Sequence, residues 1–228
     1  MVRVVKENSS VMHFREKTKR IVGVRAATQD DVAVVARIHK ARFGGLEYTL
    51  GQYSIGLIRE FYAAFLGRSA FLVHVSNCGV DGFLVGGTPQ QVAAAQRAFV
   101  RNNLVRCCLE TLSHPRLWRA AYHFIRRSYL PQPIKFVEIL APNLPKMLSI
   151  AVDEAATGSG AAGALVKAFE LSICGRHPGY ILSVLKTNRR AVRFYEKMGM
   201  QIIVDTFPRS FILQKEFEAP DDDTPQEP

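Results

Sequence analysis

The spacing of apolar and polar residues predicts strands and helices in close succession along the chain. Apolar runs at 21–26, 71–75 and 80–85 have the length and composition of strands. The second and third runs are separated by Ser76-Asn77-Cys78-Gly79, where polar residues followed by glycine favour a tight turn. We therefore expect these two runs to form a β-hairpin.

Helical spacing recurs twice between the first strand and the hairpin. Thr28-Gln29-Asp30-Asp31 resembles a capping box, with Asp in place of Glu, and opens a segment that ends at Gly44-Gly45. A second helical segment covers 53–65. The faces that define them are Val32, Val35, Ala36 and His39 in the first helix, and Ile58, Phe61, Tyr62 and Phe65 in the second.

The C-terminal half of the chain contains two units in which a strand runs into a helix. The first leads from the apolar run 148–152 through a glycine-containing segment, 157–163, into an alanine-rich helix. The second leads from 181–184 to Asn188 and a helix that ends at Gly199. Two further apolar runs predict antiparallel strands around Pro208, at 201–205 and 210–215.

The segment 88–145 differs in character from the rest of the chain. It holds two basic helical patterns, broken at His114-Pro115, and then a proline-spaced stretch with a candidate strand at 135–140. Seven arginines between residues 88 and 131 stand against one acid, Glu110. We interpret the segment as a mostly helical, basic insertion.

The ends of the chain differ from its middle in charge and apolar content. Residues 1–20 read as a basic N-terminal arm, and 217–228 as an acidic, disordered tail. The remaining span, 21–216, is long enough for one domain that contains the insertion.

Composition is that of a globular protein, because 48% of the 228 residues are hydrophobic and 22% are charged. No uncharged apolar run reaches the ~18 residues of a membrane span, and the polar N-terminus lacks the apolar core of a secretion signal. The net charge of +10 favours an anionic ligand, although solvated surface explains such charge as well. A cytoplasmic protein without a metal site is expected from the spacing of the cysteines, Cys78, Cys107, Cys108 and Cys174.

The glycine-containing segment has the features of an anion site. A strand that runs through Gly158-Ser159-Gly160 into a helix leaves main-chain N–H groups unpaired at the positive end of the helix dipole. The small side chains of 158–162 leave room for a phosphate to approach the main chain. A plain tight turn before an alanine-rich helix explains the same glycines equally well.

The same glycines also satisfy the dinucleotide fingerprint G-x-G-x-x-G at Gly158, Gly160 and Gly163. Three features count against a nicotinamide or flavin cofactor. The glycines start well beyond Val152, no acid follows 181–184 to hold a ribose, and too little chain remains to complete a doubly wound sheet.

The second unit places a tyrosine beside the glycine-containing segment. Ala191, Phe194, Tyr195 and Met198 share one helix face, and core packing explains all of them except the tyrosine. A buried tyrosine hydroxyl needs a partner, and it can protonate a basic leaving group such as a thiolate. Asn188 is read first as a helix cap, with an amide that also faces the cleft.

Both motifs together resemble those of the GNAT superfamily of acyl-CoA-dependent N-acyltransferases. These proteins carry an R/Q-x-x-G-x-G/A loop for the coenzyme A pyrophosphate, and 157–162 occupies that register with Thr157 in place of Arg or Gln. A later N-x-x-A-x-x-F-Y-x-x-x-G-F/M motif is matched by Asn188, Ala191, Phe194, Tyr195, Gly199 and Met200.

The resemblance covers roughly 21–216 and implies a fold of the α/β (α+β) class. It is a mixed, mostly antiparallel twisted sheet flanked by helices, here with a helical insertion before the central strand. It also implies acetyl-CoA as co-substrate. The implied cofactor-binding residues are Ile150, Ala151 and Val152 in the strand, Thr157, Gly158, Ser159, Gly160, Ala161 and Ala162 in the loop, and Asn188.

The same resemblance implies direct attack of a primary amine on the thioester. The amide near Ile150 would steady the thioester oxygen, and Tyr195 would be the general acid. The loss of a phosphate contact at Thr157 would be compensated by Lys186, Arg189, Arg190 or an arginine of the insertion. Tyr195 alone is named as catalytic, because no spacing singles out a base among Glu47, Tyr48, Glu138 and His123.

The acceptor is less well defined by the sequence. The arginines of 88–145 favour a small anionic amine such as an amino-sugar nucleotide, with a protein or peptide amine as the alternative. A non-catalytic acyl-CoA sensor also stays open, and monomer and homodimer fit equally. A further alternative is a module that binds RNA or an anionic membrane. Its contact residues would be Phe99, Leu112, Trp118, Tyr122 and Phe124.

Overall fold

The structure is a computed structural model that describes residues 21–45, 48–113, 118, 143–206 and 209–217. Seven strands form one sheet in the order β1-β2-β3-β4-β5-β7-β6. Neighbouring strands are antiparallel except β4 and β5, which are parallel. The strands are β1 (Val24–Ala26), β2 (Ala70–Ser76), β3 (Gly79–Gly87), β4 (Lys146–Val152), β5 (Gly179–Leu185), β6 (Gln201–Thr206) and β7 (Ser210–Glu216).

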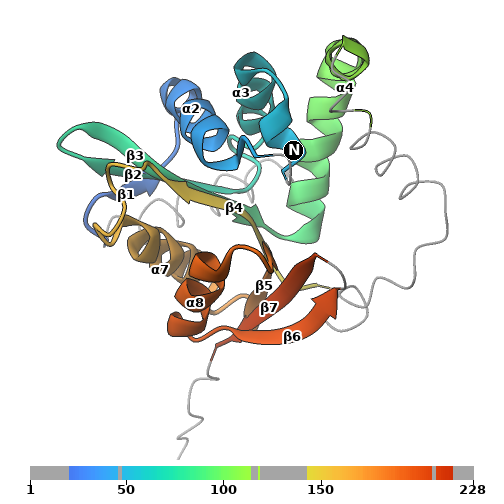
Figure 1. Cartoon of the computed structure of the whole chain (residues 1–228). Helices are drawn as coiled ribbons and strands as arrows, with labels where there is room; N and C mark the ends of the chain where they lie inside the picture. The colour runs from blue at the N-terminus through green and yellow to red at the C-terminus, as the bar shows by residue number, and fades with distance from the viewer. Residues whose placement is uncertain (1–20, 46–47, 114–117, 119–142, 207–208, 218–228) are drawn as a thin grey trace, which may run out of the picture.

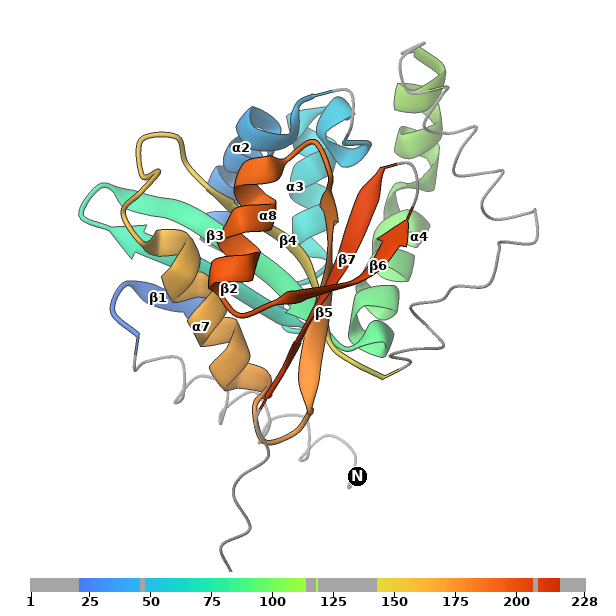
Figure 2. The same ribbon diagram turned by 60° about the horizontal axis from the view of Figure 1, so that its bottom comes forward.

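Helices cover both faces of this sheet (Figures 1 and 2). On one face lie α2 (Val32–Phe43) and α3 (Ile55–Ala63), with α4 (Pro89–Ser113) beside α3. On the other face lie α7 (Ala161–Ile173) and α8 (Arg189–Lys197). The prediction of a mixed, mostly antiparallel sheet flanked by helices is confirmed. A doubly wound sheet does not fit the described residues, in which β4 and β5 are the one parallel pair.

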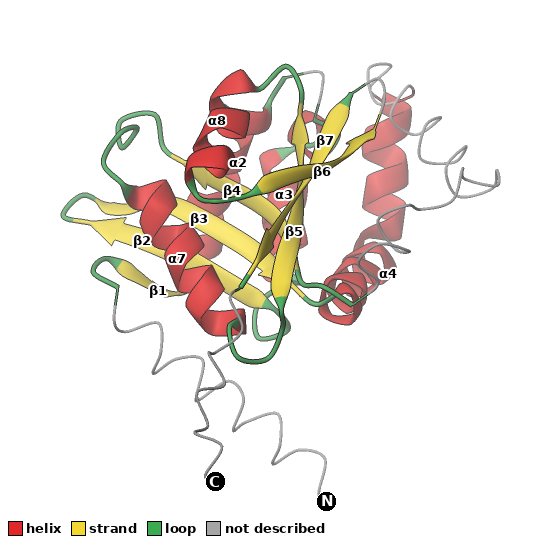
Figure 3. Ribbon diagram, turned by 90° about the horizontal axis from the view of Figure 1, so that it is seen from below, coloured by secondary structure: helices red, strands yellow, loops and turns green. Residues whose placement is uncertain are grey.

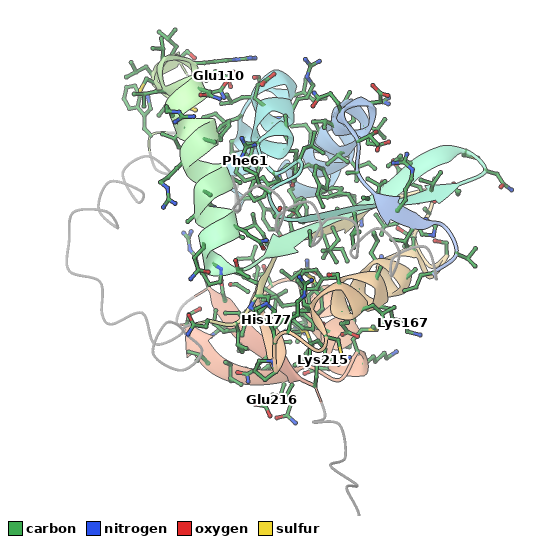
Figure 4. The ribbon with its side chains drawn as sticks, turned by 180° about the vertical axis from the view of Figure 1, so that it is seen from behind. Phe61, Glu110, Lys167, His177, Lys215 and Glu216 are labelled. Carbon is green, nitrogen blue, oxygen red and sulfur yellow. The ribbon has the colours of Figure 1, made fainter. Side chains whose placement is uncertain are left out.

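The predicted helix faces form the core on the α2–α3 side of the sheet. Asp31 closes the expected capping box with Thr28 and also accepts two hydrogen bonds from Arg25, at 2.6 and 2.8 Å. Phe61 is half-buried and packs against Phe99 of α4, with ring centroids 5.3 Å apart (Figure 4). The other predicted residues are buried, namely Val32, Val35, Ala36, His39, Ile58, Tyr62 and Phe65.

On the other face of the sheet, polar contacts connect α7 to the strands. Glu170 Oε1 accepts hydrogen bonds from Tyr180 Oη and Lys215 Nζ, both at 2.8 Å. Tyr180 is fully buried on β5, and Lys215 lies on β7 (Figure 4). These bonds tie the middle of α7 to the C-terminal part of the sheet, on the face away from α2 and α3.

The first basic pattern of 88–145 forms α4, which kinks at Asn103 (φ −126°, ψ 15°). Phe99 is core packing rather than a contact surface, whereas Leu112 and Trp118 are exposed. The second basic pattern, the candidate strand at 135–140, Tyr122 and Phe124 lie outside the described residues. So do the predicted arm at 1–20 and all but the first residue of the tail at 217–228.

Two further features bear on the kind of protein. The four cysteines are free thiols. Within the ranges that the structure describes, no helix combines the length and the apolar character needed to cross a membrane.

A polar network crosses the apolar layer between α2, α3 and β4. The hydroxyl of Tyr62 lies 2.7 Å from His39 Nδ1 and donates to Ser149 Oγ at 3.2 Å. Burial, reinforced by the charge of Lys40, lowers the pKa of His39 to about 4. His39 is therefore a neutral hydrogen-bonding group in the folded protein near neutral pH.

This burial of His39 predicts a loss of stability in mild acid. The pKa of an unfolded histidine is about 6.5, so the unfolded chain binds more protons than the folded chain between that pH and about pH 4. Stability should fall by on the order of 2 kcal/mol as the pH drops through this window. Thermal unfolding of the parent and of His39→Gln measures it.

The variant is expected to be less stable but to have a flatter pH dependence above about pH 4.5, where most carboxylates are still charged. His177→Gln is the control, because the pKa of His177 is also lowered, by partial burial and by Arg176, but that residue is only half-buried. An unchanged slope in His39→Gln would contradict the prediction.

Candidate active site

The two parallel strands of the sheet separate soon after they pair. β4 and β5 are joined only at Lys146–Ile181 and Met147–Leu182, although β4 continues to Val152 and stays paired with β3 to that residue. Main-chain groups of 148–152 that point away from β3 thus have no strand partner in the described part of the chain. Such an edge can pair with an extended ligand.

The chain leaves this edge through a loop that leads into α7. Gly158 (φ +90°) and Gly160 (φ +87°) have left-handed backbones, and a Cβ at either would meet no other residue within 4 Å. The N–H of Ala161 donates to Ser159 Oγ at 3.3 Å. Four N–H groups lack a hydrogen-bond partner among the described residues, those of Gly158, Gly160, Ala162 and Gly163.

These free donors lie at the N-terminus of a thirteen-residue helix, where the dipole favours negative charge. The glycine-containing segment is therefore more than a tight turn, since it exposes several main-chain donors in one place. Both the donors and the open space at the two glycines suit a phosphate group.

The third component comes from α8, which lies beside α7 on the same face of the sheet (Figure 3). Asn188 caps α8, because its Oδ1 accepts from the N–H of Ala191 at 3.1 Å. Tyr195 is 8% exposed, and its hydroxyl has no hydrogen-bond partner among the described residues. Burial, together with the neighbouring Tyr48, raises the pKa of Tyr195, so the phenol keeps its proton at neutral pH.

A cavity of about 420 Å³ lies where these three components meet. Ser159 is absent from its walls and instead caps the start of α7 through Ala161. Every other predicted site residue lines the cavity: Ile150, Ala151, Val152, Thr157, Gly158, Gly160, Ala161, Ala162, Asn188 and Tyr195.

The cavity has further walls that the sequence motifs did not assign. Arg42 and Phe43 come from the last turn of α2, and Tyr48 comes from the segment that follows. Arg190, one of the cations expected to compensate for Thr157, also lines the cavity. Basic residues in the last turn of a helix usually complement its dipole, so nothing in the sequence marked Arg42 as a site residue.

The remaining candidate cations that the sequence named individually, Lys186 and Arg189, do not line the cavity, whereas one candidate base does. Lys186 forms an ion pair with Asp205, and Arg189 is not a wall of the cavity. Of the four candidate bases, only Tyr48 lies in the described part of the chain, and it lines the cavity opposite Tyr195. The other three lie outside the described residues, at Glu47, His123 and Glu138.

The described residues contain no group of three His, Cys, Asp or Glu side chains placed to hold an ion. The cavity offers main-chain donors, the phenols of Tyr195 and Tyr48, and two guanidinium groups.

Part of the chain that contains this combination matches a known family. The model of the acetyltransferase (GNAT) family matches residues 117–200, which include the loop and α8. No curated protein matches the sequence significantly. The match to this segment confirms the resemblance to the GNAT superfamily that the motifs predicted.

Several solved structures have the same fold at low sequence identity. The structure named SsHAT is 20% identical and has a TM-score of 0.61, with 85% of this chain and 96% of that chain covered. An N-acetyltransferase from Staphylococcus aureus Mu50 is 17% identical with a TM-score of 0.58, covering 84% and 99%. Ard1 from Thermoplasma volcanium is 18% identical with a TM-score of 0.51, covering 86% and 97%.

The loop geometry predicts a specific effect of a methyl group at Gly160. Gly160→Ala strains a left-handed backbone and places a Cβ in the open space through which a phosphate would approach the main chain. We expect a loss of about 1 kcal/mol of stability, as for other left-handed glycines, and at least about tenfold weaker binding of acetyl-CoA. Thermal unfolding and calorimetric titration measure the two effects.

A matched control stands just beyond the other end of the same helix. Gly175 is also left-handed (φ +78°), and a Cβ there would likewise meet no other residue within 4 Å. Gly175→Ala should lose similar stability and bind acetyl-CoA normally. Equal binding by both variants would show that the loop does not hold the ligand.

Proposed function

We propose that this protein is an acetyl-CoA-dependent N-acetyltransferase that acts on a small amine carrying an anionic group. The observation that carries the proposal is the meeting, in one cavity, of an unpaired strand edge, free N–H donors and a protonated tyrosine. These are a site for an extended thioester arm, a site for its diphosphate and an acid for its sulfur.

Each component has a role in binding the co-substrate. The N–H groups of Gly158, Gly160, Ala162 and Gly163 would hold the pyrophosphate of acetyl-CoA, with Arg190 supplying the charge that Thr157 lacks. The pantetheine arm would pair with the free edge of 150–152. This pairing would bring the thioester to the main chain near Ile150, between α2 and α8.

The chemical step then follows from the position of the thioester. The amine attacks the acetyl carbonyl, and the main-chain N–H near Ile150 stabilises the oxyanion that forms. When the carbon–sulfur bond breaks, Tyr195 gives its proton to the departing thiolate, and the nitrogen loses a proton to a base or to water. The raised pKa of Tyr195 keeps that proton available.

The acceptor class rests on Arg42. Its side chain is exposed, lines the same cavity and forms no ion pair with any described residue. It comes from α2, on the side of the cavity away from the loop, so it suits an anionic group of the acceptor better than the diphosphate. The sequence prediction rested on the arginines of 88–145. Those that lie in α4, Arg97, Arg101 and Arg106, are not walls of the cavity, and the others lie outside the described residues.

Replacement of Tyr195 tests the catalytic proposal. Tyr195→Phe should lower kcat by about a hundredfold, the usual size of a general-acid contribution, and leave the Kd for acetyl-CoA unchanged. Tyr180→Phe is the control, because it also removes a buried hydroxyl but lies outside the cavity. Steady-state kinetics measures kcat, and calorimetry measures the Kd for acetyl-CoA. Calorimetry with NAD(P) tests the competing class of cofactor.

The outcomes separate the alternatives. Binding of acetyl-CoA without turnover by either the parent or the variant favours an acyl-CoA sensor. Binding of NAD(P) instead of acetyl-CoA would reject the proposal. Full activity of Tyr195→Phe would agree with an acetyltransferase but would show that Tyr195 is not its general acid.

Replacement of Arg42 tests the acceptor class. Arg42→Gln should raise KM several-fold, about the value of one exposed charge pair, for amines that carry a phosphate or carboxylate. KM for uncharged amines and for acetyl-CoA should not change. Arg37→Gln, exposed on the same helix but outside the cavity, is the control. A parent enzyme that prefers peptide amines, or is indifferent to the anionic group, would contradict this acceptor class.

A further inference from the structure

A buried hydrogen-bonded chain runs from α2 through α3 to β4. His39 is 5% exposed and Tyr62 is fully buried, and Tyr62 Oη lies 2.7 Å from His39 Nδ1 and 3.2 Å from Ser149 Oγ. Neither His39 nor Tyr62 is a wall of the candidate active site. The site described above therefore assigns no role to this hydrogen-bonded network of three side chains.

The direction of these hydrogen bonds follows from the single proton of a phenol. Tyr62 donates its proton to Ser149 Oγ, so it can only accept from His39. His39 Nδ1 must then carry a hydrogen, and Nε2 is left with a bare lone pair. That Nε2 atom is buried and is the one buried side-chain nitrogen or oxygen without a partner in the described part of the chain.

A buried polar atom without a partner is unfavourable, so the arrangement needs a compensating advantage. The ring of His39 is held among aromatic rings, with centroids 4.8 Å from Phe43 and 5.4 Å from Tyr62. This packing fixes the plane of the imidazole and aims its Nδ1–H at Tyr62. The histidine thus acts as a rigid donor that orients the phenol.

Ser149, at the other end of the chain, occupies a special position in β4. The register of β3 against β4 shifts between Val85–Ser149 and Gly86–Met147, which leaves Leu148 as the extra residue of a β-bulge. The pairing of β4 with β5 ends at Met147. Ser149 is therefore the first paired residue after both the bulge and the separation, immediately before Ile150.

We infer that Tyr62, oriented by His39, is a positioning residue for acyl transfer, which through Ser149 fixes the main chain of β4 where it meets the thioester. A strand that has lost one neighbour and carries a bulge can shift relative to the remaining one. The Tyr62–Ser149 hydrogen bond ties it to α3 at that point. The inference rests on the proposed function, since it deepens the role of β4 in that reaction.

The test compares removal of the bond from either side. Tyr62→Phe and Ser149→Ala should each lower kcat about tenfold, because misplacement by a fraction of an ångström weakens transition-state contacts. The Kd for acetyl-CoA should stay within about twofold, since ground-state binding is less sensitive to such a shift. The double variant should be no worse than either single variant, because both remove one interaction.

Two controls separate positioning from a general loss of stability. Tyr180→Phe removes a buried hydroxyl from the opposite core and should lower the melting temperature while leaving kcat near that of the parent. Ser149→Thr keeps the hydroxyl and should restore most of the activity. If Tyr62→Phe fails to fold, the partly exposed Ser149 still allows the comparison.

Two measurements do not depend on turnover. Nitrogen NMR of the imidazole should show His39 protonated at Nδ1 and bare at Nε2. Amide hydrogen exchange at 148–152 should be faster in Tyr62→Phe than in the parent or in Tyr180→Phe. Absence of acetyl-CoA binding by the parent would reject the proposed function. The NMR and exchange results would then still decide whether His39 orients Tyr62 and whether Tyr62 holds β4.

The inference is overturned by any of several results. These are normal kcat in both Tyr62→Phe and Ser149→Ala, additive effects in the double variant, or a hydrogen on Nε2 of His39. Unchanged exchange at 148–152 in Tyr62→Phe would also reject it.

Discussion

The candidate site depends on the separation of β4 from β5 after two residue pairs. A strand in the middle of a sheet normally has all its main-chain groups paired, so a free edge inside a sheet is unusual. Here the second half of β4 keeps its bonds to β3 and exposes its other edge to the cavity. The sheet thus supplies a binding groove without an additional loop.

The positions of the other components follow from the same separation. Because β4 and β5 are parallel, both run into helices at the same end of the sheet, where α7 and α8 start on one face (Figure 3). The start of α7 presents free N–H groups, and α8 presents Tyr195. The gap between the strands therefore lies between the free N–H groups of the loop and Tyr195, which is the geometry that the proposed thioester co-substrate requires.

Most of this arrangement could be predicted from the sequence, because it depends on local patterns. Helical spacing located α2 and α3, the hairpin turn located β2 and β3, and the two motifs located the loop and Tyr195. Asn188 was correctly read as a cap, since an Asn before a helix is a local signal. Ser159 was assigned to the ligand by its position in the motif, but its hydroxyl is used within the loop.

Arg42 and the His39–Tyr62–Ser149 chain could not be predicted, because they depend on contacts between elements far apart in the sequence. His39 fits a helix face and Tyr62 fits another, and nothing in either pattern shows that the two polar atoms meet. Ser149 in an apolar strand was the only local irregularity. A polar residue at that position becomes informative only when its partner is known, since a buried hydroxyl must be satisfied from a neighbouring element. The fold supplies that partner, and with it a reason why the chain tolerates an unpaired imidazole nitrogen in its core: the ring holds the phenol that reaches Ser149, next to the bulge of β4.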